Sequence, residues 1–187
     1  VKQNDLFEVI GEILGKKPKR ATRYPEVMKS LQGASMRARK QVKLLLAEDN
    51  EINREMTVAL LTKRGYTIEA VENGWQAVTA WKEGDYHLIL MDVQMPEMNG
   101  FDATREIRRL EAGEKHVPIV AMTAHAMKGD QERCLEVGMD DYVSKPLDPE
   151  YVVDVIDRWA GLEKLRQAER TAEGEISSGE MGGNGAP

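Results

Sequence analysis

"HLILMDVQMPEMNG" (residues 87–100) is an almost wholly apolar run that ends on one carboxylate, Asp92, before Pro96 and the turn residues Asn99-Gly100. Continuous apolar runs of this length are typical of strands buried on both faces, as in a parallel sheet covered by helices. A carboxylate at the end of such a strand lies at the edge of the sheet. The stretch therefore predicts an α/β fold with an acidic group held at a sheet edge.

Four further segments complete a repeating strand–helix pattern. Apolar runs at 42–47 and 117–122 predict buried strands, whereas the mixed segments 66–71 and 141–145 are typical of edge strands. Helical patterns lie between the strands, at about 51–64, 74–83, 100–112, 126–137 and 149–160. With right-handed crossovers, these units predict a doubly wound (βα)5 flavodoxin-like fold, whose five-stranded parallel sheet has the order 2-1-3-4-5.

Composition limits where the protein works and what it contacts. No run of about 18 apolar residues occurs, so we expect no membrane contact, and the single Cys134 excludes an internal disulfide framework. We expect a cytoplasmic location, although a longer parent chain could be membrane-anchored; the missing initiator Met favours such a parent. Residues 16–43 hold ten Lys/Arg against one acid. With one aromatic and no motif, we interpret this run as a solvated linker rather than a nucleic-acid surface.

In the predicted sheet, polar side chains follow each strand that borders the ligand crevice. Strand 1 ends in Glu48-Asp49, strand 3 in Asp92, strand 4 near Thr123 and strand 5 in Lys145-Pro146. Packed carboxylates repel one another, and a hard cation such as Mg²⁺ removes the conflict.

Carboxylates also act as nucleophiles toward phosphorus. Asp92 stands alone on the middle strand and is the expected nucleophile, with Glu48 and Asp49 as metal ligands. The backbone carbonyl of Gln94 could supply one further metal oxygen. Lys145 would neutralise phosphoryl oxygens, and Thr123 would hydrogen-bond one of them.

Three stretches carry a family resemblance: "LLAEDNEINREM", "LILMDVQMPEMNGFDATREIR" and "VPIVAMTAHAM…GMDDYVSKPL". Together they resemble the receiver domain of two-component response regulators, of the kind found in hybrid sensor histidine kinases, over residues 42–161. The resemblance implies that Asp92 accepts a phosphoryl group from a phosphohistidine. The donor would be a kinase dimerisation and phosphoacceptor domain or a histidine phosphotransfer protein. It also implies a cis peptide before Pro146, and an inward turn of Tyr142 that remodels the face of the fourth helix, fifth strand and fifth helix.

Several alternatives stay open from sequence alone. Gln94 and His125 are either solvated loop residues or neighbours of the phosphoryl group that set how fast water attacks it. A docking module that signals without phosphorylation would keep the same fold, although the complete acidic and basic set argues against it. Beyond self-phosphotransfer and autodephosphorylation, no kinase catalysis is expected here, since none of the three histidines lies in a helical phosphoacceptor motif.

The ends of the chain resemble each other. Residues 1–15 align with 147–161 in their apolar positions and in a terminal glycine. We interpret 1–15 as the last helix of a truncated upstream receiver-like domain and 16–40 as the linker to a receiver domain at 41–161. Any two amphipathic helices share a 3.6-residue pattern, which is the competing explanation. The apolar face of 1–15 predicts either disorder or dimerisation, and 162–187 predicts a helix extension and a disordered tail.

Overall fold

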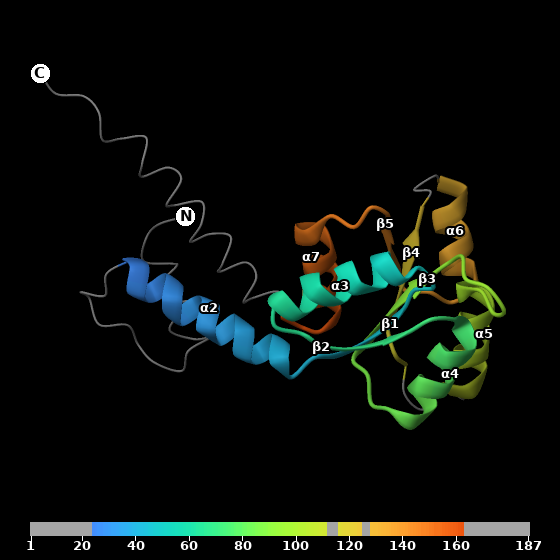
Figure 1. The fold of residues 1–187 in the computed structure, drawn as a ribbon, viewed down its shortest axis with the longest axis horizontal. Helices are drawn as coiled ribbons and strands as arrows, with labels where there is room; N and C mark the ends of the chain where they lie inside the picture. Colours follow the sequence, from blue (N-terminus) through green and yellow to red (C-terminus); the bar gives the residue numbers. More distant parts are fainter. Residues whose placement is uncertain (1–23, 112–115, 125–127, 163–187) are drawn as a thin grey trace, which may run out of the picture. The chain divides into compact units, whose positions relative to one another are not determined.

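The computed structural model describes residues 24–111, 116–124 and 128–162, so the predictions for residues 1–15, His125 and the tail beyond residue 162 lie outside the described residues. The elements in chain order (Figure 1) are α2 (Tyr24–Lys40), β1 (Lys43–Ala47), α3 (Glu51–Lys63), β2 (Thr67–Val71), α4 (Gly74–Glu83), β3 (Leu88–Asp92), α5 (Gly100–Glu111), β4 (Ile119–Thr123), α6 (Lys128–Glu136), β5 (Asp141–Ser144) and α7 (Pro149–Trp159). Two compact units divide the chain, residues 39–160 and residues 1–38 with 161–187.

All described strands form one parallel sheet with the order β2-β1-β3-β4-β5, which confirms the predicted flavodoxin-like topology. Every residue of β3 and β4 is buried, as are the last four residues of β1. Helices α3 and α7 lie on one side of the strands and α4 and α5 on the other (Figure 1). The central strands are therefore covered on both faces, which is why their sequences are continuous apolar runs.

The outer strands differ as expected. In β2 no residue is fully buried, and in β5 only Val143 is buried. Glu69 projects from β2 with its carboxylate 3.3 Å from the Lys43 ammonium, on neighbouring β1. Charges on an edge strand oppose pairing with further strands.

Three helices begin where the sequence places a capping residue. The side chains of Asn50 and Asn73 accept the backbone N–H three residues ahead, at the starts of α3 and α4. Asp148 caps α7 and accepts two backbone N–H groups, with Pro149 at the first helical position. Because each cap directly follows a strand-end loop, it fixes where the chain turns away from the carboxyl edge of the sheet.

Helix α2 covers residues that the sequence analysis interpreted only as a basic linker. The stretch 24–40 is rich in good helix formers, and its one glycine, Gly33, does not interrupt the helix. The linker interpretation rested on charge and overlooked this propensity. At Arg39 the expectation of a solvated basic run does not hold, because this side chain is only 6% exposed, whereas the role of residues 16–40 as a linker stays a prediction.

Arg39 belongs to a buried polar cluster within the unit 39–160. Its guanidinium lies 2.7 Å from Asp157 Oδ2 on α7, and its Nε is 3.2 Å from both carboxylate oxygens. The Tyr66 hydroxyl donates to Asp157 Oδ1 at 2.5 Å, and the guanidinium lies 5.8 Å from the centroid of the Tyr66 ring. Burial, followed by the adjacent Asp157 carboxylate, holds the pKa of Tyr66 far above its usual range. The phenol therefore stays a hydrogen-bond donor.

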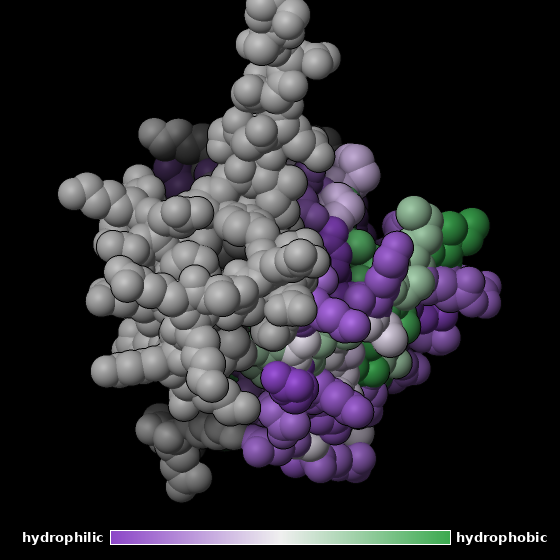
Figure 2. All heavy atoms as spheres, turned by 90° about the vertical axis from the view of Figure 1, so that its left-hand side faces the viewer, coloured by the Kyte–Doolittle hydropathy of each residue, from purple (hydrophilic) through white to green (hydrophobic). Residues whose placement is uncertain are grey.

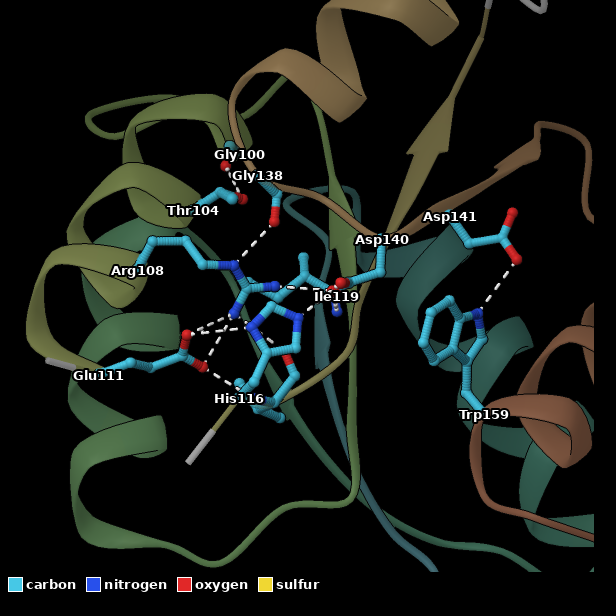
Figure 3. A network of polar contacts seen from close by, with 11 residues as sticks. Gly100, Thr104, Arg108, Glu111, His116, Ile119, Gly138, Asp140, Asp141 and Trp159 are labelled. Atoms are coloured by element: carbon cyan, nitrogen blue, oxygen red, sulfur yellow. Dashed lines mark hydrogen bonds and ion pairs between the residues drawn. The ribbon is translucent and has the colours of Figure 1, made fainter. Parts of the chain in front are cut away.

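A second network, around Arg108 of α5, joins the end of α5 to the segments that precede β4 and β5 (Figure 3). The guanidinium donates to the Gly138 carbonyl, to both Glu111 oxygens and to Asp140 Oδ2, at 2.7–2.9 Å. His116 Nε2 lies 2.6 Å from the other Asp140 oxygen. One arginine thus holds together the end of α5 and the turn before β5.

The surface shows no sign of a membrane segment among the described residues. Figure 2 shows one face of the molecule, on which hydrophilic side chains predominate among the coloured residues and hydrophobic ones gather in small separate patches. No described helix combines the length and the apolar character needed to cross a bilayer.

Candidate functional site

Glu48, Asp49 and Asp92 converge at the carboxyl ends of β1 and β3. One carboxylate oxygen from each lies within 4.8 Å of the other two. The Glu48 and Asp92 side chains are buried, whereas Asp49 is exposed. The topology explains this convergence, because β1 and β3 are neighbours at the point where the winding of the sheet reverses.

The first turn of α3 holds the acidic pair in place. Asn53 donates from its side-chain amide to Glu48 Oε1 at 3.2 Å. Arg54 donates to the backbone carbonyls of Glu48 and Asp49, at 3.0 and 3.1 Å. The sequence analysis missed both residues. Their position one turn after the Asn50 cap was the available signal, since the first turn of that helix must face the strand end that precedes it.

Asp92 is anchored through both of its oxygens. The backbone N–H of Gln94 donates to Oδ1 at 3.1 Å, and the Lys145 ammonium lies 2.6 Å from Oδ2. The side chain is only 8% exposed. Burial, the largest influence, raises the pKa of Asp92 above its ordinary value, and the nearby Glu48 charge adds to this, while Lys145 and the Gln94 N–H oppose it. The nucleophile predicted from sequence is therefore a carboxylate whose negative charge is incompletely compensated.

Lys145 is shared between two carboxylates. Its ammonium lies 2.5 Å from Glu48 Oε2 as well as 2.6 Å from Asp92 Oδ2. Burial lowers the pKa of Lys145, but the hydrogen bonds and charges of Asp92 and Glu48 outweigh it, and the net direction is upward. The pKa values of Asp92 and Lys145 are both raised, the first mainly by burial and the second because two acids share one base. Lys145 therefore stays protonated. Its charge only partly counteracts the effect of burial on the Asp92 carboxylate, so the pKa of Asp92 stays raised.

The loop after β3 approaches the site closely. A side-chain carbon at Gly100 would lie 2.2 Å from the Asp92 carbonyl oxygen, so only glycine allows α5 to begin here. Asn99 caps this helix by accepting the Asp102 N–H at 3.0 Å. Glu97 has a φ of 66°, in the left-handed region that non-glycine residues seldom adopt. The predicted turn at Asn99-Gly100 is thus a tight support for the end of β3.

A cavity of about 710 Å³ lies at the carboxyl edge of the sheet. The predicted residues around it are Glu48, Asp49, Asp92, Gln94, Thr123 and Lys145. Phe101 of α5 and Arg133 of α6 also line it and were not predicted. Sequence offered no cue for them beyond helical spacing, because which helix faces contact the cavity depends on packing.

Two further predicted positions lie along β5. Tyr142 is partly buried and packs against the hydrophobic core, next to the site end of the strand. The Lys145–Pro146 peptide bond is cis, and the Lys145 N–H donates to the Thr123 carbonyl at 2.8 Å. The strand ends that carry the hydroxyl and the ammonium are therefore joined by a backbone hydrogen bond.

The donor set fits a magnesium ion. Carboxylate oxygens within 4.8 Å of one another are hard ligands, and two of the three acids are buried and would repel each other without a cation. Glu48, Asp49 and Asp92 are the side chains that would hold it. Lys145 already satisfies part of the same need, so a metal and this ammonium would share Glu48 and Asp92.

Comparison with known proteins gives consistent relatives. The chain is 49% identical over 121 residues to the hybrid signal transduction histidine kinase I of Dictyostelium discoideum, covering 62% of this chain and 7% of that protein. It is 38% identical over 160 residues to the sensor histidine kinase GacS of Pseudomonas protegens, covering 83% of this chain and 16% of that protein. The chain therefore spans only a small part of the length of these curated relatives.

Solved structures agree. The receiver domain of a sensor histidine kinase from Pseudomonas aeruginosa PAO1, with a magnesium ion coordinated in its active-site cleft, is 42% identical. It matches with a TM-score of 0.59 over 64% of this chain and 98% of its own. The receiver domain of Saccharomyces cerevisiae Ssk1, crystallised with the histidine phosphotransfer protein Ypd1, is 32% identical with a TM-score of 0.60, over 66% of this chain and 91% of its own.

The sequence profile of one family matches residues 44–157, which is more than half of the chain. This range contains all of the sheet except Lys43, the first residue of β1, and it contains every described charged residue that lines the cavity. The chain belongs to the response regulator receiver domain family.

Proposed function

We propose that this chain accepts a phosphoryl group on Asp92 from a phosphohistidine, with Mg²⁺ as the cofactor, and that it serves in a hybrid histidine kinase system. One observation carries the proposal. Asp92 ends the central strand of the sheet, lies beside two further carboxylates and accepts a hydrogen bond from the Lys145 ammonium. Phosphoryl transfer needs positioning and charge neutralisation more than covalent chemistry, and this arrangement supplies both.

In the proposed reaction an oxygen of Asp92 attacks phosphorus and forms a new P–O bond. The P–N bond of the phosphohistidine breaks, and its electron pair stays on the imidazole nitrogen. In this proposal Lys145 neutralises a phosphoryl oxygen, and the Thr123 hydroxyl, at the end of β4, donates a hydrogen bond to one. A bound Mg²⁺ would supply further neutralisation of the phosphoryl oxygens.

Phosphorylation would then alter the face formed by α6, β5 and α7. Thr123 and Lys145 are joined through their backbones, so a shift of the Thr123 side chain toward the phosphoryl group acts directly beside β5. Tyr142, which is only partly buried, lies on that strand and can move inward. Local charge chemistry biasing a two-state element is the general form of such switches.

A protein donor must place its phosphohistidine at the mouth of the cavity, so its docking surface must border the site. An apolar groove of about 270 Å³ lies there, lined by Met56, Leu60, Pro146, Leu147 and Pro149 together with Glu48, Asn53, Thr57 and Lys145. Ile52 and Met56 are 68% and 67% exposed on the first turns of α3. This supports docking of an apolar helical surface, such as that of a phosphotransfer protein.

The first test is the intact mass after incubation with Mg²⁺ and acetyl phosphate. One added phosphoryl group is expected for the wild type and none for Asp92→Asn or for metal-free samples. If the folded wild type binds Mg²⁺ but gains no mass, a docking module that signals without phosphorylation becomes the better description.

The docking surface has its own test, with phosphorylated Ypd1 as the protein donor. Met56→Asp is expected to slow transfer from this donor by about tenfold or more, because a charge replaces an apolar contact at the groove. It should leave phosphorylation by acetyl phosphate nearly unchanged. Trp75→Asp is the matched control, since Trp75 is 55% exposed on α4, away from the groove. Equal slowing with both donors would place the effect in the site rather than in docking.

A further inference from the structure

Among the residues that the structure describes, five charged side chains line the cavity: Glu48, Asp49, Asp92, Arg133 and Lys145. With a divalent cation bound and Asp92 converted to its phosphoryl ester, the two remaining carboxylates and the phosphoryl dianion carry four negative charges. The metal ion and Lys145 together supply three positive charges. One more positive charge is therefore needed to bring the phosphorylated pocket to neutrality, and within the described parts of the chain Arg133 is the further basic residue that lines the same cavity.

The guanidinium of Arg133 lies over the aromatic ring of Phe101. Its guanidinium carbon lies 4.6 Å from the centroid of the Phe101 ring, on the first turn of α5. Phe101 and Arg133 both border the cavity, so the stack forms part of its wall. A guanidinium stacked on a ring face keeps its N–H groups in its own plane, where they remain available to an anion. The ring thus orients the cation without using its hydrogen-bond donors.

We propose that Arg133 is a second basic side chain on the phosphate side of the pocket, which stabilises the phosphorylated state of Asp92 and does not assist binding of the metal ion alone. The inference rests on the proposed function of Asp92 and goes beyond it, because it assigns a role to a residue of α6. It also gives a direct link between the phosphoryl group and one of the helices of the face that is proposed to switch.

The competing explanation is packing. The Arg133 side chain could simply cover the Phe101 ring, as long charged side chains often do with apolar surface. The two roles predict opposite results for metal and anion binding. A cation in the wall opposes binding of Mg²⁺ by itself and favours the anion that follows. A packing residue affects both in the same direction, through the shape of the pocket.

The test is isothermal titration calorimetry of the whole chain with Mg²⁺ alone, and then with beryllofluoride at saturating Mg²⁺. Beryllofluoride on a carboxylate carries the same total charge as an aspartyl phosphate. Arg133→Gln is expected to weaken beryllofluoride binding by about fivefold, or about 1 kcal/mol, as for a charge that is exposed and partly screened by solvent. Its affinity for Mg²⁺ alone should be equal to or tighter than that of the wild type.

Two controls sharpen the reading. Arg133→Lys keeps the charge but loses the guanidinium that stacks on Phe101, so its affinity for beryllofluoride is expected to lie between those of the wild type and Arg133→Gln. Arg105→Gln removes an exposed arginine of α5 that pairs with Asp102, and it should change neither affinity. The inference is overturned if Arg133→Gln binds beryllofluoride as the wild type does, or if it loses Mg²⁺ and beryllofluoride affinity equally. Failure of the wild type to bind beryllofluoride, with Mg²⁺ bound, would instead overturn the proposed function itself.

Discussion

The buried cluster of Arg39, Asp157 and Tyr66 makes a strong prediction about stability. Arg39→Met removes the cation that contacts both oxygens of Asp157, a residue only 1% exposed. Removing one partner of a buried ion pair costs about 3–5 kcal/mol, because the other charge stays buried without compensation. Tyr66 still donates to the carboxylate, so we expect the lower end, a loss of about 3 kcal/mol in the free energy of unfolding.

The loss of unfolding free energy can be separated into the part due to the ion pair and the part due to the Tyr66 hydrogen bond. Replacing the acid as well, in Arg39→Met with Asp157→Leu, removes the uncompensated charge and should recover most of the loss. The Tyr66 hydroxyl then lacks its acceptor, which costs about 1–3 kcal/mol when buried. Adding Tyr66→Phe should recover that part too. The series therefore tests each contact of the cluster in turn.

The assay is urea unfolding followed by circular dichroism, with free energies from linear extrapolation. Arg105→Gln serves as the control, because both members of its pair with Asp102 are more than half exposed and such pairs contribute about 0–1 kcal/mol. A loss for Arg39→Met no larger than that of this control would refute the reasoning, and so would a double variant less stable than Arg39→Met.

Three other perturbations have defined outcomes. Gly100→Ala places a carbon against the Asp92 carbonyl, so unfolding free energy should fall by about 2–4 kcal/mol in urea titrations and Mg²⁺ binding should weaken in calorimetry. Because burial raises the pKa of Asp92, the folded protein binds the Asp92 proton more tightly than the unfolded chain does. The stability that this provides is fully present below the ordinary pKa and is lost as pH rises through the raised pKa. Asp92→Asn should therefore gain stability over the wild type as pH rises through that window, in unfolding measured across pH, and wild-type Mg²⁺ affinity should decline as pH falls through it. Lys145→Gln removes an ammonium that occupies Glu48 and Asp92, so calorimetry should show tighter Mg²⁺ binding while phosphorylation by acetyl phosphate slows.

Much of the fold follows from the sequence because its strands differ so clearly in burial. Continuous apolar runs identify the strands buried on both faces, and the mixed run at 66–71 identifies an edge. The strand order then follows from chirality and short connections. Asp92 and Glu48 could be expected to meet, because parallel neighbouring strands end at one edge.

The remaining features depend on packing that a linear pattern does not encode. In the sequence Arg39 is indistinguishable from the other basic residues of the run 16–43, and its partner Asp157 lies 118 residues away. Arg133 lines the cavity only because of how α6 rests against the first turn of α5. The sharing of Lys145 between two acids likewise depends on distances that strand order leaves open.

The exposed edge strand β2 has a consequence for chains that contain several similar domains. Its outer backbone groups could in principle template a strand from a neighbouring copy, and covalent linkage makes such encounters frequent. Glu69 places a charge on this edge strand, paired with Lys43 of the neighbouring strand β1. Loss of those charges in a multidomain chain would therefore cause mispairing between adjacent domains during biosynthesis and lower the yield of folded protein. The isolated domain would keep its chemistry.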